Sequence, residues 1–227
     1  MDPASLFLHP RDQAATNQIH LAGILQWCYR LIGRFVVLDI SRLMIAETQT
    51  LKKSRLALPE FQFRELTRDD LHRHSTSADL RIADDAKERL DRQHRCFAAF
   101  HGNLLISYCW FARHSIDADN NRGRHPQSGV GLNLPDDAVF VYDAITIKAY
   151  RGRNVISSIL HHAASFLVED GILRALTTTD WTNTSALRAM EKSRFRSLGT
   201  ICKLSLMNAS LTFVPKQATA MGIQTLE

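Results

Sequence analysis

A strand, a tight turn and a helix in direct succession constrain the fold more than any other part of the sequence. The apolar segment Ala138–Ile147 leads into the turn Tyr150-Arg151-Gly152-Arg153, and the chain continues into the helical pattern of Asn154–Asp170. The first turn of such a helix carries unpaired backbone N–H groups and the positive end of the helix dipole. Arg151 and Arg153 add fixed positive charge beside it. The stretch therefore predicts a binding site for a phosphate or pyrophosphate group.

The other elements follow from hydrophobic periodicity and from turn residues. Further strands are predicted at 61–66, 95–100, 104–113, 173–179 and 200–207. Further helices are predicted at 67–71, 84–92 and 184–193. Thr67 is expected as the N-cap of the first of these helices, and Gly171 as the C-cap of the helix that follows the turn. In chain order the pattern is β-α-α-β-β-β-α-β-α-β, which predicts an α+β fold with a mixed sheet and helices packed on it.

The chain divides into three predicted parts. Residues 1–58 form an N-terminal extension, with an amphipathic helix over 17–32 and a short strand over 35–40. The regular elements fill residues 59–207, which are expected to form one domain. Residues 208–227 are expected to form a C-terminal tail.

Composition narrows the classes of function. The net charge of +5 on 227 residues attracts anions such as cofactor phosphates, but no basic run interleaved with aromatics indicates a nucleic-acid groove. The four cysteines form no C-x-x-C pair, which predicts reduced thiols in a cytoplasmic protein. No signal peptide is expected at the N-terminus. Arg30, Arg34, Asp39 and Arg42 interrupt the apolar stretch over 19–45, which excludes a membrane span there.

Three segments, taken in order, carry a family resemblance. Phe61–Asp70 precedes the others as a strand and helix start, Tyr150-Arg151-Gly152-Arg153 lies between a strand and a helix, and Asn183–Phe195 contains a helix ending in Glu-Lys. Together they resemble the GCN5-related N-acetyltransferases (GNAT), whose acyl-CoA-binding pattern is Gln/Arg-x-x-Gly-x-Gly/Ala. The resemblance covers residues 60–207 and implies a central, mostly antiparallel sheet flanked by helices. It also implies an N-acyltransferase that moves an acyl group, acetyl in first place, from acyl-CoA to a primary amine.

The resemblance implies binding residues for the donor as well. The pantetheine arm is expected to pair with the backbone of Ile145, Thr146 and Ile147. Asn183 is expected to bind the pantetheine or to help order the site. The diphosphate is expected at the turn and at the start of the helix, along Arg151, Gly152, Arg153, Asn154, Val155, Ile156, Ser157 and Ser158.

Tyr142 and Asp143 are the candidate catalytic residues, because they lie on the strand beside the expected position of the thioester. Side chains alternate along a strand, so only one of the two is expected to point into the cleft. Asp143 is the first candidate for the base that takes a proton from the attacking amine, and a structural role beside an arginine or the backbone is its alternative. No metal site is expected, since His72 and His74 have no third ligand at usable spacing and HExxH is absent.

Four positions depart from the family pattern. Asn154 stands at its first glycine, although Asn tolerates a left-handed backbone better than most residues. Ile156 stands at its second small position, where bulk would crowd a diphosphate. Met190 stands where many relatives have the tyrosine that protonates the departing thiolate, and Met has no proton to donate. Arg194 replaces the glycine before Phe195.

These departures leave alternatives open. The donor is either acyl-CoA or an acyl carrier protein, whose pantetheine arm carries a single phosphodiester and whose acidic surface suits a basic partner. A catalytically inactive thioester-binding or scaffold module is a further alternative. The helix over 17–32 would also suit peripheral contact with a membrane surface. The acceptor, a small-molecule or peptide amine, is expected at the long exposed loop predicted over 114–137 and at the segment between the helices predicted over 67–71 and 84–92. An oligomer is a further alternative.

Overall fold

A computed structural model gives the architecture and describes residues 27, 37–53, 58–74, 80, 82, 85–121, 128–206 and 209–226. The helix predicted over 17–32 lies outside the described residues except for Trp27. The strands are β1 (Val37–Glu47), β2 (Gln62–Glu65), β3 (Arg95–His101), β4 (Leu104–Arg113), β5 (Ser115–Ile116), β6 (Leu132–Asn133), β7 (Ala138–Thr146), β8 (Arg174–Asp180), β9 (Arg196–Leu206), β10 (Ala209–Phe213) and β11 (Gln224–Thr225). The helices are α2 (Thr48–Lys53), α3 (Arg68–His74), α4 (Ala86–Asp91), the 3-10 helix η2 (Lys148–Tyr150), α5 (Val155–Glu169), α6 (Thr184–Lys192) and α7 (Lys216–Ala220).

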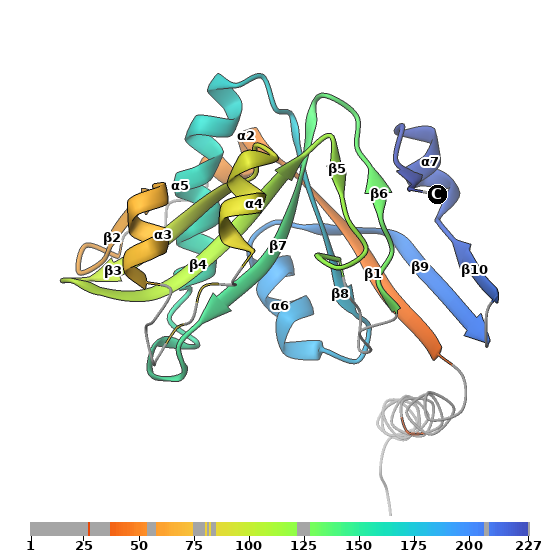
Figure 1. The fold of residues 1–227 in the computed structure, drawn as a ribbon, viewed down its shortest axis with the longest axis horizontal. Coiled ribbons are helices and arrows are strands. Elements are labelled where there is room, and N and C mark those ends of the chain that lie inside the picture. The colour runs from red at the N-terminus through yellow and green to blue at the C-terminus, as the bar shows by residue number, and fades with distance from the viewer. Residues whose placement is uncertain are drawn as a thin grey trace, which may run out of the picture.

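One large sheet organises the described part of the chain (Figure 1). Its strands follow the order β10-β9-β1-β8-β7-β4-β3-β2. β7 and β8 pair in parallel, and the other neighbours pair in antiparallel orientation. This arrangement confirms the predicted α+β fold with a mixed, mostly antiparallel sheet.

The strand predicted over 35–40 is β1, and it is longer and more central than expected. β1 pairs with β8 on one side and with β9 on the other, so it belongs to the same sheet as residues 59–207. The stretch Leu43–Ala46 is buried at every position. Both faces of this strand are covered, so it lacks the polar alternation that marks a half-buried strand. The boundary predicted at residue 58 therefore does not separate two packing units.

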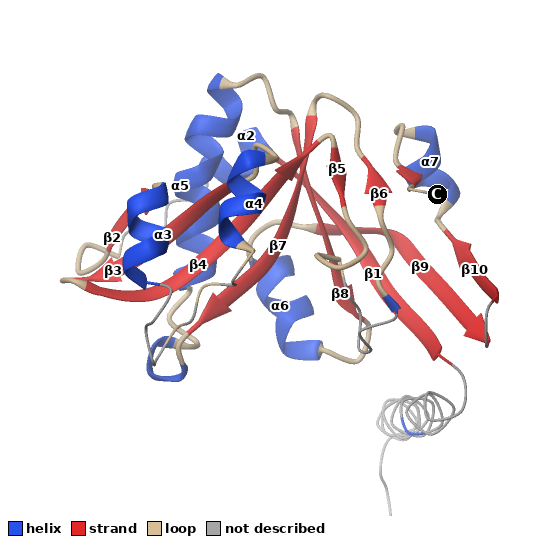
Figure 2. Ribbon diagram, viewed as in Figure 1, coloured by secondary structure: helices blue, strands red, loops and turns tan. Residues whose placement is uncertain are grey.

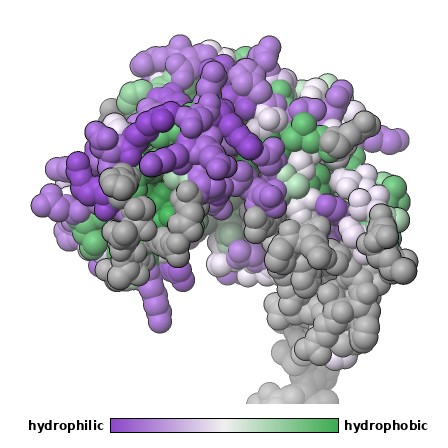
Figure 3. All heavy atoms as spheres, in the orientation of Figure 1, coloured by the Kyte–Doolittle hydropathy of each residue, from purple (hydrophilic) through white to green (hydrophobic). Residues whose placement is uncertain are grey.

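Helices cover both faces of the large sheet (Figure 2). On one face α2, α5 and α6 pack over a core that includes Phe97 and Val141. On the other face α3 and α4 pack over a core that includes Trp110 and Phe140. The surface seen over α3 and α4 is mainly hydrophilic (Figure 3), as expected for amphipathic helices. Among the helices of the described part, none is long and apolar enough to cross a membrane.

Within the exposed loop predicted over 114–137 and the tail predicted over 208–227, the described residues 114–121, 128–137 and 209–226 are more ordered than expected. β5 and β6, both from the first segment, pair with each other, and β11 from the second segment pairs with β6. These three strands form a small separate sheet. Ile116, Leu132 and Ile223 are buried in the core. β10 extends the large sheet beside β9. The sequence predictions were wrong here because these apolar residues are single and widely spaced, without a periodic run.

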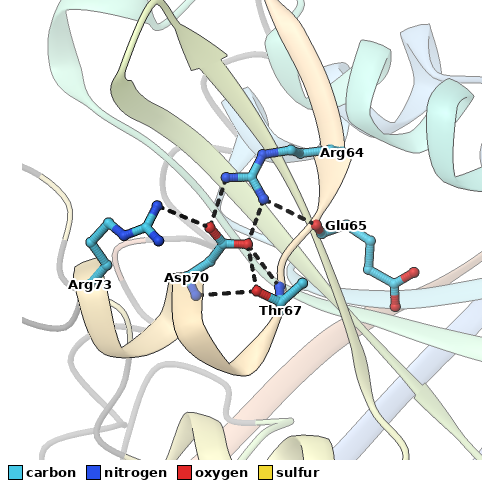
Figure 4. Close-up of polar contacts among 5 residues, drawn as sticks. All are labelled: Arg64, Glu65, Thr67, Asp70 and Arg73. Atoms are coloured by element: carbon cyan, nitrogen blue, oxygen red, sulfur yellow. Dashed lines mark hydrogen bonds and ion pairs between the residues drawn. The ribbon is translucent and has the colours of Figure 1, made fainter.

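The start of α3 is fixed by a reciprocal cap (Figure 4). The Asp70 carboxylate accepts hydrogen bonds from the Thr67 backbone N–H at 3.0 Å and from its hydroxyl at 2.9 Å, while Thr67 Oγ1 accepts from the Asp70 N–H at 3.3 Å. Arg64 donates through both terminal nitrogens to the same carboxylate. The hydrogen bond from Arg64 is the main cause that holds the pKa of Asp70 well below its usual range. Thr67 is therefore confirmed as the N-cap.

Candidate functional site

A cleft opens where β7 and β8 separate. The two strands pair only between Ala138–Phe140 and Arg174–Leu176, and beyond these residues they diverge, with α6 across the gap (Figure 1). The cleft has a volume of about 970 Å³. Its lining comes from β7, β8, α4, α6 and the segment after β5. A parallel pair that separates in this way leaves strand backbone accessible for a ligand between the two strands.

β7 carries a bulge at the cleft wall. Its register against β4 shifts between the pairs Tyr108–Ile145 and Trp110–Tyr142, so β7 has one residue more than β4 in this interval. Asp143 lies there with a φ of 45°, in the left-handed region. Such a bulge breaks the alternation of side chains. Tyr142 contacts His94 and Asp143 contacts Arg89, so both side chains point toward the α4 segment, which corrects the expectation that they lie on opposite faces.

Arg89 of α4 fixes the Asp143 side chain. Its Nη1 donates to Asp143 Oδ2 at 2.5 Å, and its Nε lies 2.9 Å from Asp85 Oδ1. Burial acts to lower the pKa of Arg89, but the hydrogen bond to Asp143 and the Asp85 carboxylate outweigh it and raise the pKa. Sequence reasoning missed Arg89, since an Asp-x-x-x-Arg pair on a helix is typical of a solvated surface. Here the guanidinium is buried and belongs to the cleft wall.

Tyr142 forms a buried hydrogen bond with His94, the first residue after the α4 turn. Its hydroxyl lies 2.7 Å from His94 Nδ1. Burial raises the pKa of Tyr142. Burial, with the nearby Arg89 guanidinium, lowers the pKa of His94 to about 4. Both groups are therefore neutral at neutral pH, and the hydroxyl can donate to an unprotonated Nδ1.

The turn before α5 keeps the backbone that the glycine pattern requires. Asn154 has a φ of 59° and Gly152 a φ of 78°, so both are left-handed, which confirms that Asn154 supports this turn. Arg151 Nε donates to the Thr146 carbonyl at 3.0 Å. The guanidinium of Arg153 lies 5.3 Å from the Tyr150 ring centroid. The turn residues 151–154 are exposed, so their basic side chains are accessible to an anion.

The first turn of α5 offers fewer groups to a phosphate than the sequence suggested. The Ser158 N–H donates to the Asn154 carbonyl at 3.0 Å, so this amide is already part of the helix. Val155, Ser157 and Ser158 are buried, and Ser157 Oγ bonds Ser193 Oγ at 2.5 Å. The side chains of Val155 and Ser157 are therefore not accessible to a phosphate. Ile156 is half-buried and lines the cleft.

The expected pantetheine strand lies at the end of β7. The Ile145 carbonyl and the Thr146 hydroxyl both contact Ser107 Oγ, at 2.8 and 2.9 Å. The Ile147 N–H donates to the Ile106 carbonyl at 3.0 Å. These contacts anchor residues 145–147 to β4, on the side away from β8. Pairing with a pantetheine arm on the β8 side stays a prediction.

α6 forms the other side of the cleft. Asn183 is its N-cap, and its Oδ1 accepts from the Ala186 N–H at 3.1 Å. Asn183 and Met190 both line the cleft, and Met190 is buried. Arg194 follows the helix with a φ of 69°. As at Asn154, the chain keeps a left-handed backbone where the family pattern has glycine, at a cost of about 1–2 kcal/mol.

Carboxylates dominate the charge of the cleft. Of the lining residues that the structure describes, four are aspartates and one is an arginine, Arg89. The aspartates are Asp85, Asp119, Asp143 and Asp180. The negative charge of this lining attracts cations, although the net charge of the whole chain is +5. Among the described residues, no group of three or more His, Cys, Asp or Glu side chains is arranged to hold a metal ion.

Comparisons with known proteins give a likeness in fold alone. No family model and no curated protein matches the sequence. The structure is similar to a GCN5-related N-acetyltransferase from Kribbella flavida, with a TM-score of 0.51 and 11% identity over 78% of this chain and 62% of that one. A putative GNAT-family acetyltransferase from Novosphingobium aromaticivorans has a TM-score of 0.48 and 14% identity, over 74% and 64% of the two chains.

A conserved protein of unknown function from Staphylococcus epidermidis has a TM-score of 0.47 and 12% identity, over 78% and 64%. The chain thus spans less than two thirds of the length of these solved structures, between 62% and 64%. The chain has the fold of the GCN5-related N-acetyltransferases, at only 11–14% sequence identity to these solved examples.

Proposed function

We propose that the chain is an N-acyltransferase that moves an acyl group from a pantetheine thioester, acyl-CoA in first place, to an amine. The observation that carries the proposal is the cleft between β7 and β8, beside the exposed basic turn at the start of α5. An anion site at a helix N-terminus next to an open strand edge suits a ligand with a phosphate end and an extended amide arm. Acyl-pantetheine donors have this shape.

In this proposal, each part of the donor binds the residues that the sequence predicts for it. Arg151, Arg153 and the first N–H groups of α5 receive the diphosphate. The arm follows residues 145–147, and Asn183 lies on the opposite side of the cleft. The bulge at Asp143 then lies beside the thioester.

The reaction is a direct transfer. The amine nitrogen attacks the thioester carbonyl carbon, a carbon–nitrogen bond forms, the carbon–sulfur bond breaks, and the nitrogen loses a proton. Asp143 has one oxygen bonded to Arg89, so its carboxylate is held in a fixed orientation at the wall. An oriented carboxylate can position the amine and accept its hydrogen bond. The aspartates of the cleft favour an acceptor that is cationic before it reacts.

A carrier-protein donor is the second candidate, and Ile156 favours it. This side chain stands in the first turn of α5 and lines the cleft, where its bulk would narrow the space for a diphosphate. A carrier-bound arm brings one phosphodiester and needs less room there. The exposed Arg151 and Arg153 would then meet the acidic surface of the carrier.

Calorimetric titration with CoA tests the donor. We expect binding in the micromolar range, weakened about tenfold when Arg151 and Arg153 are both changed to Gln, because each loses a charge-assisted contact. Lys216→Gln on α7 is the matched control, since it removes an exposed positive charge far from the turn. Micromolar CoA binding would contradict a donor restricted to carrier proteins.

Thiol release tests the reaction itself. Acetyl-CoA, longer acyl-CoA and acyl carrier protein are each supplied with a panel of mono-, di- and polyamines, and free thiol is followed with a chromogenic disulfide. Amine-dependent release with any donor supports the proposal. Binding of a thioester with no release under any of these conditions would instead support an inactive binding module.

A further inference from the structure

Tyr142 and His94 connect two cavities. Tyr142 lines the cleft between β7 and β8, and His94 lines a second cavity of about 360 Å³. This second cavity is bounded by the end of α4 and by residues 113–117. The hydroxyl and the imidazole meet at 2.7 Å, and both residues are 5% exposed. The hydrogen bond is thus a buried polar bridge between a reaction cleft and a second pocket.

The surroundings hold the pair in this arrangement. The Tyr142 ring packs against Trp110, with ring centroids 6.3 Å apart, and the Arg89 guanidinium lies 5.1 Å over the Tyr142 ring. The His94 backbone N–H donates to the Arg89 carbonyl at 2.9 Å. His94 is therefore fixed by the same residue that orients Asp143. His94 also belongs to the lining of the second cavity, which a role in packing alone would not require.

We propose that Tyr142 and His94 form a proton relay between the cleft and the second cavity, which serves both the amine and the departing sulfur. The inference rests on the proposed acyl transfer. It supplies a route for the two proton movements of that reaction, for which Met190 offers no group.

The proton movements balance over one turnover. The relay starts with the Tyr142 hydroxyl donating to Nδ1 of a His94 ring that carries its proton on Nε2. The nitrogen of the new amide gives its extra proton, directly or through one water, to the phenol oxygen as the phenol proton passes to Nδ1. Nε2 then releases its proton to water in the second cavity.

The return step restores the relay. The thiolate takes the proton that the phenol now directs into the cleft, the Nδ1 proton returns to the phenol oxygen, and Nε2 takes a proton back from water. One proton has left the nitrogen and one has reached the sulfur, so no external acid or base is consumed. Each residue ends in its starting protonation state.

Chemical rescue tests the relay. His94→Ala opens space beside the second cavity, and we expect thiol release to fall about 100-fold, as for loss of a general acid–base group. Added imidazole should restore at least a tenth of the lost rate. 1,2,4-Triazole has the same size but is a much weaker base, and it should restore little.

Two further variants keep the result interpretable. Tyr142→Phe retains the ring packing and should lose a similar factor in kcat with little change in KM, without rescue by imidazole. His74→Ala removes a partly buried ring that packs on Phe100, away from the cleft, and its rate should not respond to either compound.

The outcomes separate the two proposals. If the unchanged protein releases no thiol with any donor, the proposed function fails and the relay fails with it. If it does release thiol, the relay alone fails when His94→Ala and Tyr142→Phe keep the full rate. The relay also fails when triazole rescues His94→Ala as well as imidazole does, because the ring would then only fill space.

Discussion

Replacing Asp70 by Asn tests whether the cap of α3 depends on a charged carboxylate. The Asp70 side chain is only 7% exposed and receives hydrogen bonds from Arg64 and Thr67. Asn has the same shape but carries no charge and can accept through only one atom. Its NH2 group must face either the Arg64 guanidinium or the Thr67 N–H and hydroxyl. In both cases two hydrogen-bond donors would face each other.

The expected loss follows from these contacts. Losing the charge-assisted bonds to Arg64 costs about 1.5–3 kcal/mol, and weakening the cap adds about 1 kcal/mol. The Arg64 side chain is 42% exposed, so it stays hydrated and adds no penalty of its own. We expect a loss of about 3 kcal/mol in the free energy of unfolding. For a chain of this size that corresponds to a fall in Tm of about 6–12 °C.

Urea unfolding followed by circular dichroism measures the loss in the free energy of unfolding. Repeating the measurement at lower pH tests whether this loss depends on the charge of Asp70. The pKa of Asp70 is lowered in the folded state, so its contribution is present above the unfolded pKa of about 3.9 and is lost as the pH falls through that value toward the folded one. The difference between the two proteins should therefore shrink below about pH 4. Asp69→Asn, on the same helical turn but exposed, is the matched control and should change stability by less than about 0.5 kcal/mol. A loss below about 1 kcal/mol at neutral pH, or a difference that persists in acid, would refute the reasoning.

Three other changes have defined outcomes. Asn154→Ala should cost about 1 kcal/mol because its backbone is left-handed, whereas Asn154→Gly should be neutral or stabilising; thermal denaturation distinguishes them. Gly199→Ala should cost about 2 kcal/mol, since an added Cβ would lie 2.5 Å from Pro215 Cβ; equal Tm values would contradict this contact. A chain starting at residue 37 should keep the cooperative unfolding of the sheet, whereas a chain starting at residue 48 should lose it with the central strand β1. Size-exclusion chromatography and circular dichroism check this pair.

Regular local patterns in the sequence gave most of the fold. The hairpin of β3 and β4, the unit of β7, turn and α5, and the cap at Thr67 all follow from adjacent residues. β1 was cut short because Ser41 and Arg42 interrupt its apolar run, and its place between β8 and β9 depends on contacts far along the chain. Long-range pairing of this kind leaves no local signal.

In the candidate site too, features set by neighbouring residues could be predicted, and features set by long-range contacts could not. The basic turn could be predicted, and so could the left-handed Asn154, because both depend on neighbouring residues. The bulge that turns Tyr142 and Asp143 toward the α4 segment could not, since a bulge depends on the register against β4. Arg89, on α4, and His94, just after it, reach Asp143 and Tyr142 only through the tertiary fold.

The position of β1 also affects how the protein is made. About 130 residues separate the end of β1 from the end of β8, and β9 follows later still. At a synthesis rate of about 5–20 residues per second, β1 leaves the ribosome roughly 7–27 s before its first partner strand is complete. During that interval neither edge of β1 is paired, and its segment Leu43–Ala46 is apolar on both faces, which makes it a site for chaperone binding or aggregation. The yield of folded protein during expression should therefore depend on the time between the synthesis of β1 and that of β8, independently of the stability of the folded sheet.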